Sequence, residues 1–246
     1  NRLLGKFDLE ISRKSSKEPL RLLFTRLKSI GVETNVIWDV GAYVGSWTKE
    51  VSEYRPDSRF ILFEPNKIHN EQLSSLGKEF HNILLGKSSR RVKFFSHGGT
   101  GDSIYPEYDA NLEIRQKFRI EKTFTIDELV EDSDKFPVPD FLKLDTQGAE
   151  LDILGGGLKS LKKIKAILLE CPIVKYNWGS PNIHEYLEFM FENKFIPIQI
   201  TEIHQLSKII TQIDIAFLAE NEFKNKMRSI DDIGFWKSTI DHYSKI

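Results

Sequence analysis

The sequence lacks the features that mark several classes of protein. It has one cysteine, Cys171, which excludes an internal disulfide and any zinc or iron–sulfur site built from several cysteines. It has no apolar run approaching the roughly 20 residues of a membrane span, and nothing in it resembles a secretory signal. We therefore expect a cytoplasmic protein without a membrane span. Because the chain begins at Asn1 and not at a methionine, removal of a preceding segment stays open.

An excess of charge of either sign is also lacking. The 246 residues include 35 basic and 36 acidic side chains, for a formal net charge of −1. This balance gives no support for binding to nucleic acid or to a membrane surface. Hydrophobic residues make up 40% of the chain, which is enough for one large core, and neither an internal repeat nor a linker divides it.

The stretch VIWDVGAYVGSW, residues 36–47, predicts a strand, a glycine turn and a helix. Gly41 and Gly45 let the backbone of the turn approach a ligand closely. The pattern is D-x-G-x-x-x-G, which differs from the G-x-G-x-x-G of dinucleotide sites. Asp39, just before the turn, would repel a pyrophosphate and suits a positively charged ligand. The ammonium and sulfonium groups of S-adenosylmethionine fit that description.

A second acidic residue follows the next predicted strand, residues 59–63. Glu64 stands at its end, where nucleotide-binding α/β folds place a carboxylate that accepts hydrogen bonds from ribose hydroxyls. The glycine turn alone would also fit a plain strand–helix unit. Together with Glu64 it predicts ligand binding.

Strands and helices alternate along the chain. Beyond those already named, we predict helices over residues 19–30, 46–54, 67–78, 126–130, 149–154 and 182–193, and strands over 80–85, 92–95, 140–145, 164–170, 195–200 and 214–219, with another ending near 124. Such alternation is typical of a parallel sheet covered by helices, in which ligands bind at the carboxyl ends of the strands.

Four motifs and a fifth short one stand in order: DVGAYVG (39–45), LFEPN (62–66), TIDEL (125–129), KLDTQGAE (143–150) and LLE (168–170). This set resembles the FkbM family of class I S-adenosylmethionine-dependent methyltransferases. The resemblance implies a Rossmann-like α/β fold with a mostly parallel seven-stranded sheet, an antiparallel final hairpin and helices on both faces. It also implies O-methylation of a hydroxyl on a sugar, glycan or small natural product.

On this basis we expect a methyltransferase domain over residues 35–220, an N-terminal helical extension over 1–34 and a C-terminal helical tail over 221–246 packed on the same domain. The resemblance also implies the residues that contact S-adenosylmethionine. They are Asp39, Gly41, Ala42, Tyr43, Gly45, Glu64, Pro65, Asn66, Leu85, Asp102, Ser103 and Asp145.

Three residues are candidates for catalysis, because a hydroxyl nucleophile needs its proton removed. Asp145, after the strand 140–145, is the first candidate for a base or a substrate anchor, although it would also suit a helix cap. Glu170 is the second, with a pair to Lys143 as its alternative. His97 is the third, because it stands in a glycine-rich loop and the usual pKa of histidine suits a base; its alternative is a solvated loop histidine. That loop, residues 96–107, is either a lid or a plain connection. Asp145 and Glu170 could share a divalent ion, but no third ligand clusters with them in the sequence, and we predict no metal.

Rival functions remain at this stage. A nucleic-acid methyltransferase is disfavoured by the near-neutral charge. A non-catalytic cofactor-binding module of the same fold stays open, since the motifs predict binding but not turnover. The loop 173–181, which contains Tyr176 and Trp178, is the predicted place where the acceptor is recognised.

Overall fold

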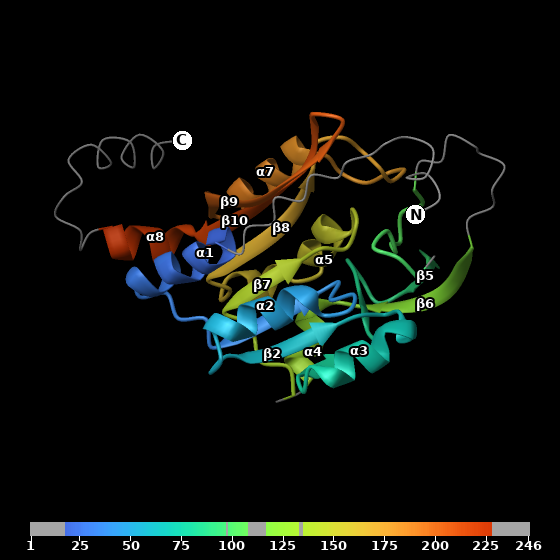
Figure 1. The fold of residues 1–246 in the computed structure, drawn as a ribbon, viewed down its shortest axis with the longest axis horizontal. Helices are drawn as coiled ribbons and strands as arrows, with labels where there is room; N and C mark the ends of the chain where they lie inside the picture. Colours follow the sequence, from blue (N-terminus) through green and yellow to red (C-terminus); the bar gives the residue numbers. More distant parts are fainter. Residues whose placement is uncertain (1–17, 97, 108–116, 133–134, 228–246) are drawn as a thin grey trace.

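The computed structural model describes residues 18–96, 98–107, 117–132 and 135–227 (Figure 1). A seven-stranded sheet with the order β3-β2-β1-β7-β8-β10-β9 runs through it. Its strands are β1 (Val36–Val40), β2 (Arg59–Phe63), β3 (Glu79–His81), β7 (Phe141–Leu144), β8 (Ala166–Pro172), β9 (Phe195–Leu206) and β10 (Ile209–Ala219). The first five strands in the order are parallel, and β10 is antiparallel to both β8 and β9. This topology confirms the predicted α/β fold and its antiparallel final hairpin.

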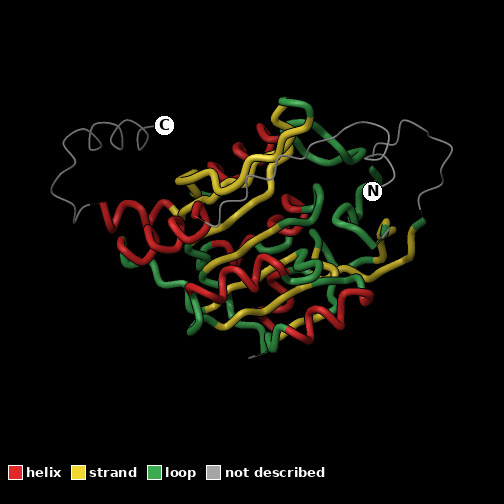
Figure 2. The backbone as a smooth tube through the Cα atoms, in the orientation of Figure 1, coloured by secondary structure: helices red, strands yellow, loops and turns green. Residues whose placement is uncertain are grey.

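Helices cover both faces of the sheet, as Figure 2 shows in red around the yellow strands. The helices α1 (Glu18–Ser29), α2 (Ser46–Tyr54) and α3 (Asn70–Ser75) pack on one face through Leu23, Phe24, Leu27, Val51 and Leu73. The helices α4 (Ile126–Asp132), α5 (Glu150–Gly155), α6 (Leu158–Leu161) and α7 (Ile183–Glu192) pack on the other through Ile126, Ile153, Leu161 and Tyr186. A short 3-10 helix, η1 (Lys67–His69), precedes α3, and α8 (Glu220–Met227) follows β10.

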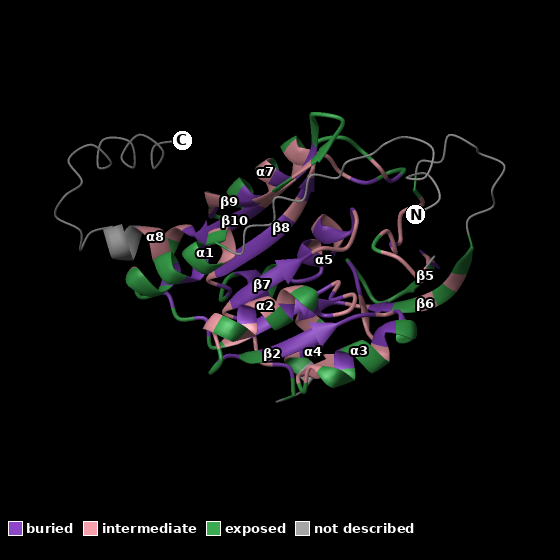
Figure 3. Cartoon of the chain, in the orientation of Figure 1, coloured by how far each residue is buried: buried purple, intermediate pink, exposed green. Residues whose placement is uncertain are grey.

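The two covered faces explain why the central strands read as continuous apolar runs. In β1, Ile37 belongs to the core on one side and Trp38 to the core on the other, and both are fully buried. In β2, Leu62 and Phe63 alternate in the same way. Figure 3 shows β2, β7 and β8 almost wholly buried between the helices. A strand of a parallel sheet must be apolar on both sides for this reason.

A smaller sheet with the order β4-β6-β5 lies beside the main one and includes β4 (Leu84–Leu85), β5 (Arg91–Phe95) and β6 (Phe118–Phe124). The prediction of one strand over residues 80–85 is therefore wrong, because β3 joins the main sheet and β4 pairs with β6. Asn82 lies between them, and its side-chain amide donates to the carbonyl oxygen of Glu64 at 2.8 Å. The strand β3 ends before these contacts. The apolar run in the sequence does not indicate them.

The helix α4 begins with a side-chain cap, whereas α5 begins after Ala149 without one. Thr125 Oγ1 accepts from the backbone N–H of Glu128 at 3.0 Å, and the Glu128 carboxylate accepts from the N–H of Thr125 at 2.9 Å, which forms a capping box at the start of α4. The final hairpin is longer than predicted: Ser207 and Lys208 turn it with φ of 48° and 70°, and β9 and β10 extend up to that turn.

Among the described residues, no helix is both long and apolar enough to cross a membrane. The thiol of Cys171 is free and buried. Most of the predicted C-terminal tail and the first half of the N-terminal extension lie outside the described residues, so the division at 34 and 220 stays a prediction.

Candidate functional site

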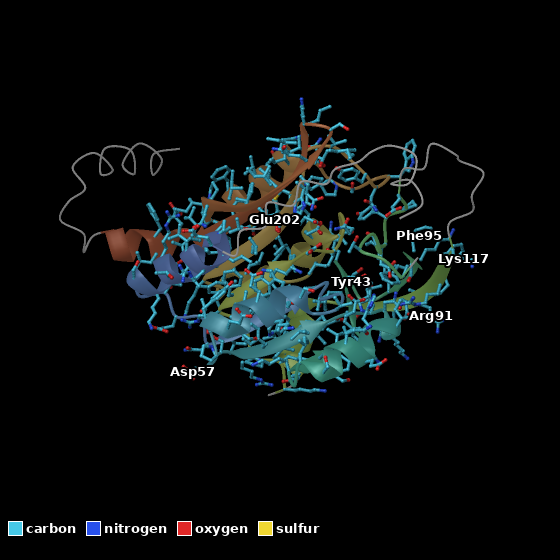
Figure 4. All side chains as sticks on the ribbon, in the orientation of Figure 1. Tyr43, Asp57, Arg91, Phe95, Lys117 and Glu202 are labelled. Atoms are coloured by element: carbon cyan, nitrogen blue, oxygen red, sulfur yellow. The ribbon has the colours of Figure 1, made fainter. Side chains whose placement is uncertain are left out.

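A cavity of about 650 Å³ opens at the carboxyl ends of β1, β2, β7 and β8. Its volume falls in the range of about 300–1,000 Å³ that is usual for sites that bind small molecules. The loop after β5 and the hairpin of β9 and β10 complete its walls. Tyr43 and Glu202, which line it from two different elements, are labelled in Figure 4. The cavity therefore lies at the edge where a parallel sheet presents its ligand site.

The turn after β1 forms the floor of the cavity with Gly41, Ala42 and Tyr43. Gly41 has φ of 75°, and its N–H donates to the carbonyl oxygen of Phe63 at 3.0 Å. Tyr43 also has a positive φ, 51°, which is unusual for a residue with a large side chain. Its N–H donates to Glu64 at 2.9 Å, so the turn is tied to the end of β2.

Glu64 is a buried carboxylate that faces this cavity. One oxygen accepts from the N–H of Tyr43, and the other accepts from the N–H of Asn66 at 2.8 Å. Burial raises the pKa of Glu64 to about 7, because the two hydrogen bonds to the ionised form only partly offset the loss of water. A ligand that donates hydrogen bonds to Glu64 would shift it to the ionised form.

Polar side chains join the loop after β5 to the strand ends. The amide of Asn66 donates to Asp102 at 2.7 Å, and Ser103 Oγ donates to the carbonyl oxygen of Gln147 at 2.9 Å. Leu85 and Ile104 give the adjoining wall an apolar surface. This combination of an apolar wall and fixed carboxylates suits a nucleoside.

Lys143 lies beneath the cavity and connects three carboxylate and carbonyl groups. Its ammonium nitrogen is 3.0 Å from Asp39 Oδ1, 3.3 Å from Asp145 Oδ2 and 3.1 Å from the carbonyl oxygen of Gly41. Burial lowers the pKa of Lys143, but the carboxylates of Asp145 and Asp39 outweigh it, so that the net shift is upward and the ammonium stays charged. Asp39 is fully buried and accepts from Thr48 at 2.7 Å, so it reaches the cavity only through Lys143.

Gln147 holds the two predicted catalytic carboxylates together. Its side-chain amide donates to Asp145 Oδ1 at 3.1 Å and to a carboxylate oxygen of Glu170. Burial raises the pKa of Asp145, but Lys143 and the hydrogen bonds from its neighbours outweigh this and hold it below its usual value. Burial and the charge of Asp145 raise the pKa of Glu170 well above its usual value. Asp145 is thus the first of the two carboxyl groups to ionise as the pH rises.

The final hairpin brings further polar side chains to the same cavity. In the register of the sheet, Asp214 lies opposite Glu170 on β8 and opposite Glu202 on β9. His204 Nε2 is 3.7 Å from Asp214 Oδ1 and 3.8 Å from Glu202 Oε1. Burial raises the pKa of Asp214 to about 6, and the proximity of Asp214 raises the pKa of His204.

The structure places most of the predicted site residues around one cavity. Those that line it are Gly41, Ala42, Tyr43, Glu64, Pro65, Leu85, Asp102, Ser103, Asp145 and Glu170. Asp39, Gly45 and Asn66 support it from behind: Gly45 begins α2, and Asn66 holds Asp102. His97 lies outside the described residues.

Three further polar residues at the cavity were assigned no role from the sequence. Lys143 was considered as a partner of Glu170, and in the structure its ion pairs are with Asp39 and Asp145. Glu202, His204 and Asp214 belong to the final hairpin, in segments that read as ordinary strands. Only the pairing of β8, β9 and β10 brings them to Glu170.

Comparison with known proteins identifies a family. Residues 39–197 match the methyltransferase FkbM domain. The hexuronic acid methyltransferase AglP of Haloferax volcanii is 24% identical over 162 residues, which cover 64% of this chain and 62% of that protein. The 2-O-methyltransferase NoeI of Sinorhizobium fredii is 25% identical over 154 residues, which cover 55% of this chain and 62% of that protein. The chain thus spans less than two thirds of the length of these relatives.

Solved structures with a similar chain course include two methyltransferases. The precorrin-6y C5,15-methyltransferase of Geobacter metallireducens has a TM-score of 0.43 and 14% identity, covering 86% of this chain and 94% of that one. The magnesium protoporphyrin IX methyltransferase ChlM of Synechocystis, solved with bound S-adenosylmethionine, has a TM-score of 0.44 and 7% identity, covering 89% and 88%.

Proposed function

Because the chain belongs to the FkbM domain family of S-adenosylmethionine-dependent methyltransferases, we propose that it methylates a hydroxyl oxygen of a sugar, glycan or small natural product. The observation that carries the proposal is the cavity at the strand ends, in which the buried Glu64 and the charged Asp145 lie on neighbouring walls. The names of the two relatives, which specify a hexuronic acid and a 2-O position, support a sugar-type acceptor.

The residues around the cavity fit the cofactor. Glu64 would accept hydrogen bonds from the ribose hydroxyls, and the apolar wall of Leu85 and Ile104 would contact the adenine ring. Asp102 and Ser103, on the next loop, would approach its polar edge. The turn of Gly41 to Tyr43 would pass beneath the methionine part. The cofactor supplies the methyl group on a positively charged sulfur.

Asp145 is the residue we assign as the base. Its side chain is 39% exposed, whereas the side chain of Lys143 beside it is 7% exposed, so Asp145 is the member of the ion pair that an acceptor can reach. Lys143 and Gln147 hold it on both sides. It would accept the proton of the acceptor hydroxyl as the oxygen–carbon bond forms and the carbon–sulfur bond breaks, with S-adenosylhomocysteine leaving.

The acceptor would enter between the loop after β5 and the loop 173–181, which are joined by hydrogen bonds. The N–H of Trp178 donates to the carbonyl oxygen of Pro106 at 2.8 Å. The side-chain amide of Asn177 donates to the carbonyl oxygen of Tyr105, also at 2.8 Å. The indole of Trp178 is half exposed, and an exposed aromatic face is the type of surface that stacks on sugar rings. We assign acceptor recognition to this pair of loops.

The test has two steps. Calorimetric titration with S-adenosylmethionine, S-adenosylhomocysteine and NAD should show micromolar binding of the first two and none of the third. Transfer of a labelled methyl group to a panel of uronic acids, neutral hexoses and their glycosides should then give an ether product. Label recovered only in nucleic acid or on nitrogen would contradict the proposal.

A further inference from the structure

Three side chains from three strands meet on one wall of the cavity. Glu170 of β8, His204 of β9 and Asp214 of β10 each have a ligand-type atom, and these atoms lie within 4.8 Å of one another. All three line the cavity, beside Asp145. Among the described residues, this is the group of such side chains with the spacing of a metal site.

Three acidic side chains gather on this wall, and His204 lies at ion-pair distance from two of them. Glu170, Asp214 and Glu202 are direct neighbours in the register of β8, β10 and β9, and like charges in such positions repel one another. His204 lies 3.7 and 3.8 Å from Asp214 and Glu202, beyond hydrogen-bond distance. Lys143, which also lines the cavity, forms its ion pairs with Asp39 and Asp145.

One buried oxygen atom of this wall also lacks a hydrogen-bond donor among the described residues. The Oδ1 oxygen of Asp214 is buried and accepts no hydrogen bond from any residue within the described ranges. Buried carboxylate oxygens almost always have a donor or a cation. This oxygen lies 3.7 Å from Nε2 of His204.

The ligand types indicate the cation. Carboxylates suit Mg²⁺, Ca²⁺ and Mn²⁺, whereas imidazole suits transition metals, so two carboxylates with one imidazole favour an ion of the Mn²⁺ type. Opposite ligands at about 2.2 Å from an ion lie about 4.4 Å apart, and the ligand atoms of this group all lie within 4.8 Å of one another. Three protein ligands leave coordination positions free on the side of the cavity.

We propose that Glu170, His204 and Asp214 bind a divalent cation of the Mn²⁺ type, which holds the methyl acceptor through two adjacent oxygen atoms. The second half of this inference rests on the proposed function. The acceptor class is narrowed to molecules with neighbouring oxygens, such as a vicinal diol or a hydroxyl beside a carboxylate. The cation would make the bound hydroxyl more acidic, and Asp145 would take its proton.

Direct metal binding tests the site without any methylation assay. The full chain, freed of metal with EDTA, is titrated with Mn²⁺ while electron paramagnetic resonance reports the free ion. We expect one ion per chain, and at least tenfold weaker binding in Asp214→Asn and in His204→Gln. Glu192→Gln, an exposed carboxylate on α7, is the control and should bind as the wild type does. Calorimetry with S-adenosylhomocysteine checks that each variant keeps its fold.

The outcomes separate this inference from the proposed function. No binding at millimolar Mn²⁺, or unchanged binding in both variants, would overturn the metal site. Methyl transfer to a hydroxyl that continues in EDTA would also overturn it and would leave the proposed function intact. Stoichiometric Mn²⁺ binding that depends on Asp214 and His204, with transfer lost in EDTA and restored by Mn²⁺, is the supporting result.

Discussion

The carbonyl oxygen of Asp145 lies 1.8 Å from the position that a Cβ atom would occupy at Gly41. The two turns that carry the most specific motifs are therefore in backbone contact, and only glycine allows this. The same contact brings the turn after β1 and the turn after β7 to one cavity.

Gly41→Ala should destabilise the fold and remove cofactor binding. A left-handed residue other than glycine costs about 1–2 kcal/mol, and the overlap with Asp145 adds about 1–3 kcal/mol. Gly77→Ala is the matched control, since Gly77 also has a positive φ, 62°, but no atom lies within 4 Å of its added Cβ. Urea unfolding should show a clearly larger loss for Gly41→Ala, and equal losses would contradict the contact.

Lys143→Met should destabilise the protein by about 3–5 kcal/mol, because it leaves the charge of the fully buried Asp39 without a partner. Lys159→Met is the control: its pair with Glu131 is exposed, at 75% and 59%, and its loss should change stability little. Chemical denaturation measures both. Adding Asp39→Asn to Lys143→Met should recover part of the loss, and a lack of recovery would argue against the ion pair.

The pKa of about 7 at Glu64 predicts a pH dependence of cofactor binding. Ribose hydroxyls donate to the ionised carboxylate, so affinity for S-adenosylhomocysteine should rise about tenfold from pH 6 to pH 8 and then level off. The stability of the fold should depend on pH in the opposite direction. The folded state holds this proton up to about pH 7 and the unfolded state loses it near 4.5, so this group's contribution to stability falls between those values.

Calorimetry across this pH range, in buffers of different ionisation enthalpy, should detect proton release on binding at pH 6. In Glu64→Gln the affinity should be lower and independent of pH. The substitution also places an amide N–H against a backbone N–H of Tyr43 or Asn66, which is a reason for reduced stability. A wild type with flat affinity would show that Glu64 does not contact the ribose.

Asp145→Asn should lower the transfer rate by about 10²–10⁴ and leave affinity for S-adenosylhomocysteine within a few-fold. Asp140→Asn, at the other end of β7, is the control, because Asp140 pairs with Lys165 at 2.8 Å and accepts backbone hydrogen bonds from Asn35 and Val36. It should reduce thermal stability and leave the rate per folded molecule unchanged. Full activity in Asp145→Asn would rule this residue out as the base.

The order of the elements follows from local sequence. Buried strands such as β2 are apolar on both sides. The turn from Gly41 to Gly45 has positive φ at both ends, which favours glycine at those positions. The sequence therefore predicted that the carboxylates at the ends of β1, β2, β7 and β8 lie together, because parallel strands bring their carboxyl ends to one edge of the sheet.

Other features depended on contacts between distant segments. Asp39 was expected at the ligand, yet in the fold it lies behind Lys143, since a side chain at that position points to the helix α2 and the hydroxyl of Thr48. The split of residues 80–85 into β3 and β4 depended on Asn82 and on the partner strand β6.

The sequence by itself determined the fold class, the family and the strand-end carboxylates, because these arise from hydrophobic periodicity, glycine turns and motifs within a few residues of each other. Only the tertiary structure decided which polar groups meet at the cavity wall. Glu170, His204 and Asp214 come from three strands, and their proximity is set by the register of antiparallel pairing, which the letters of any one strand do not specify.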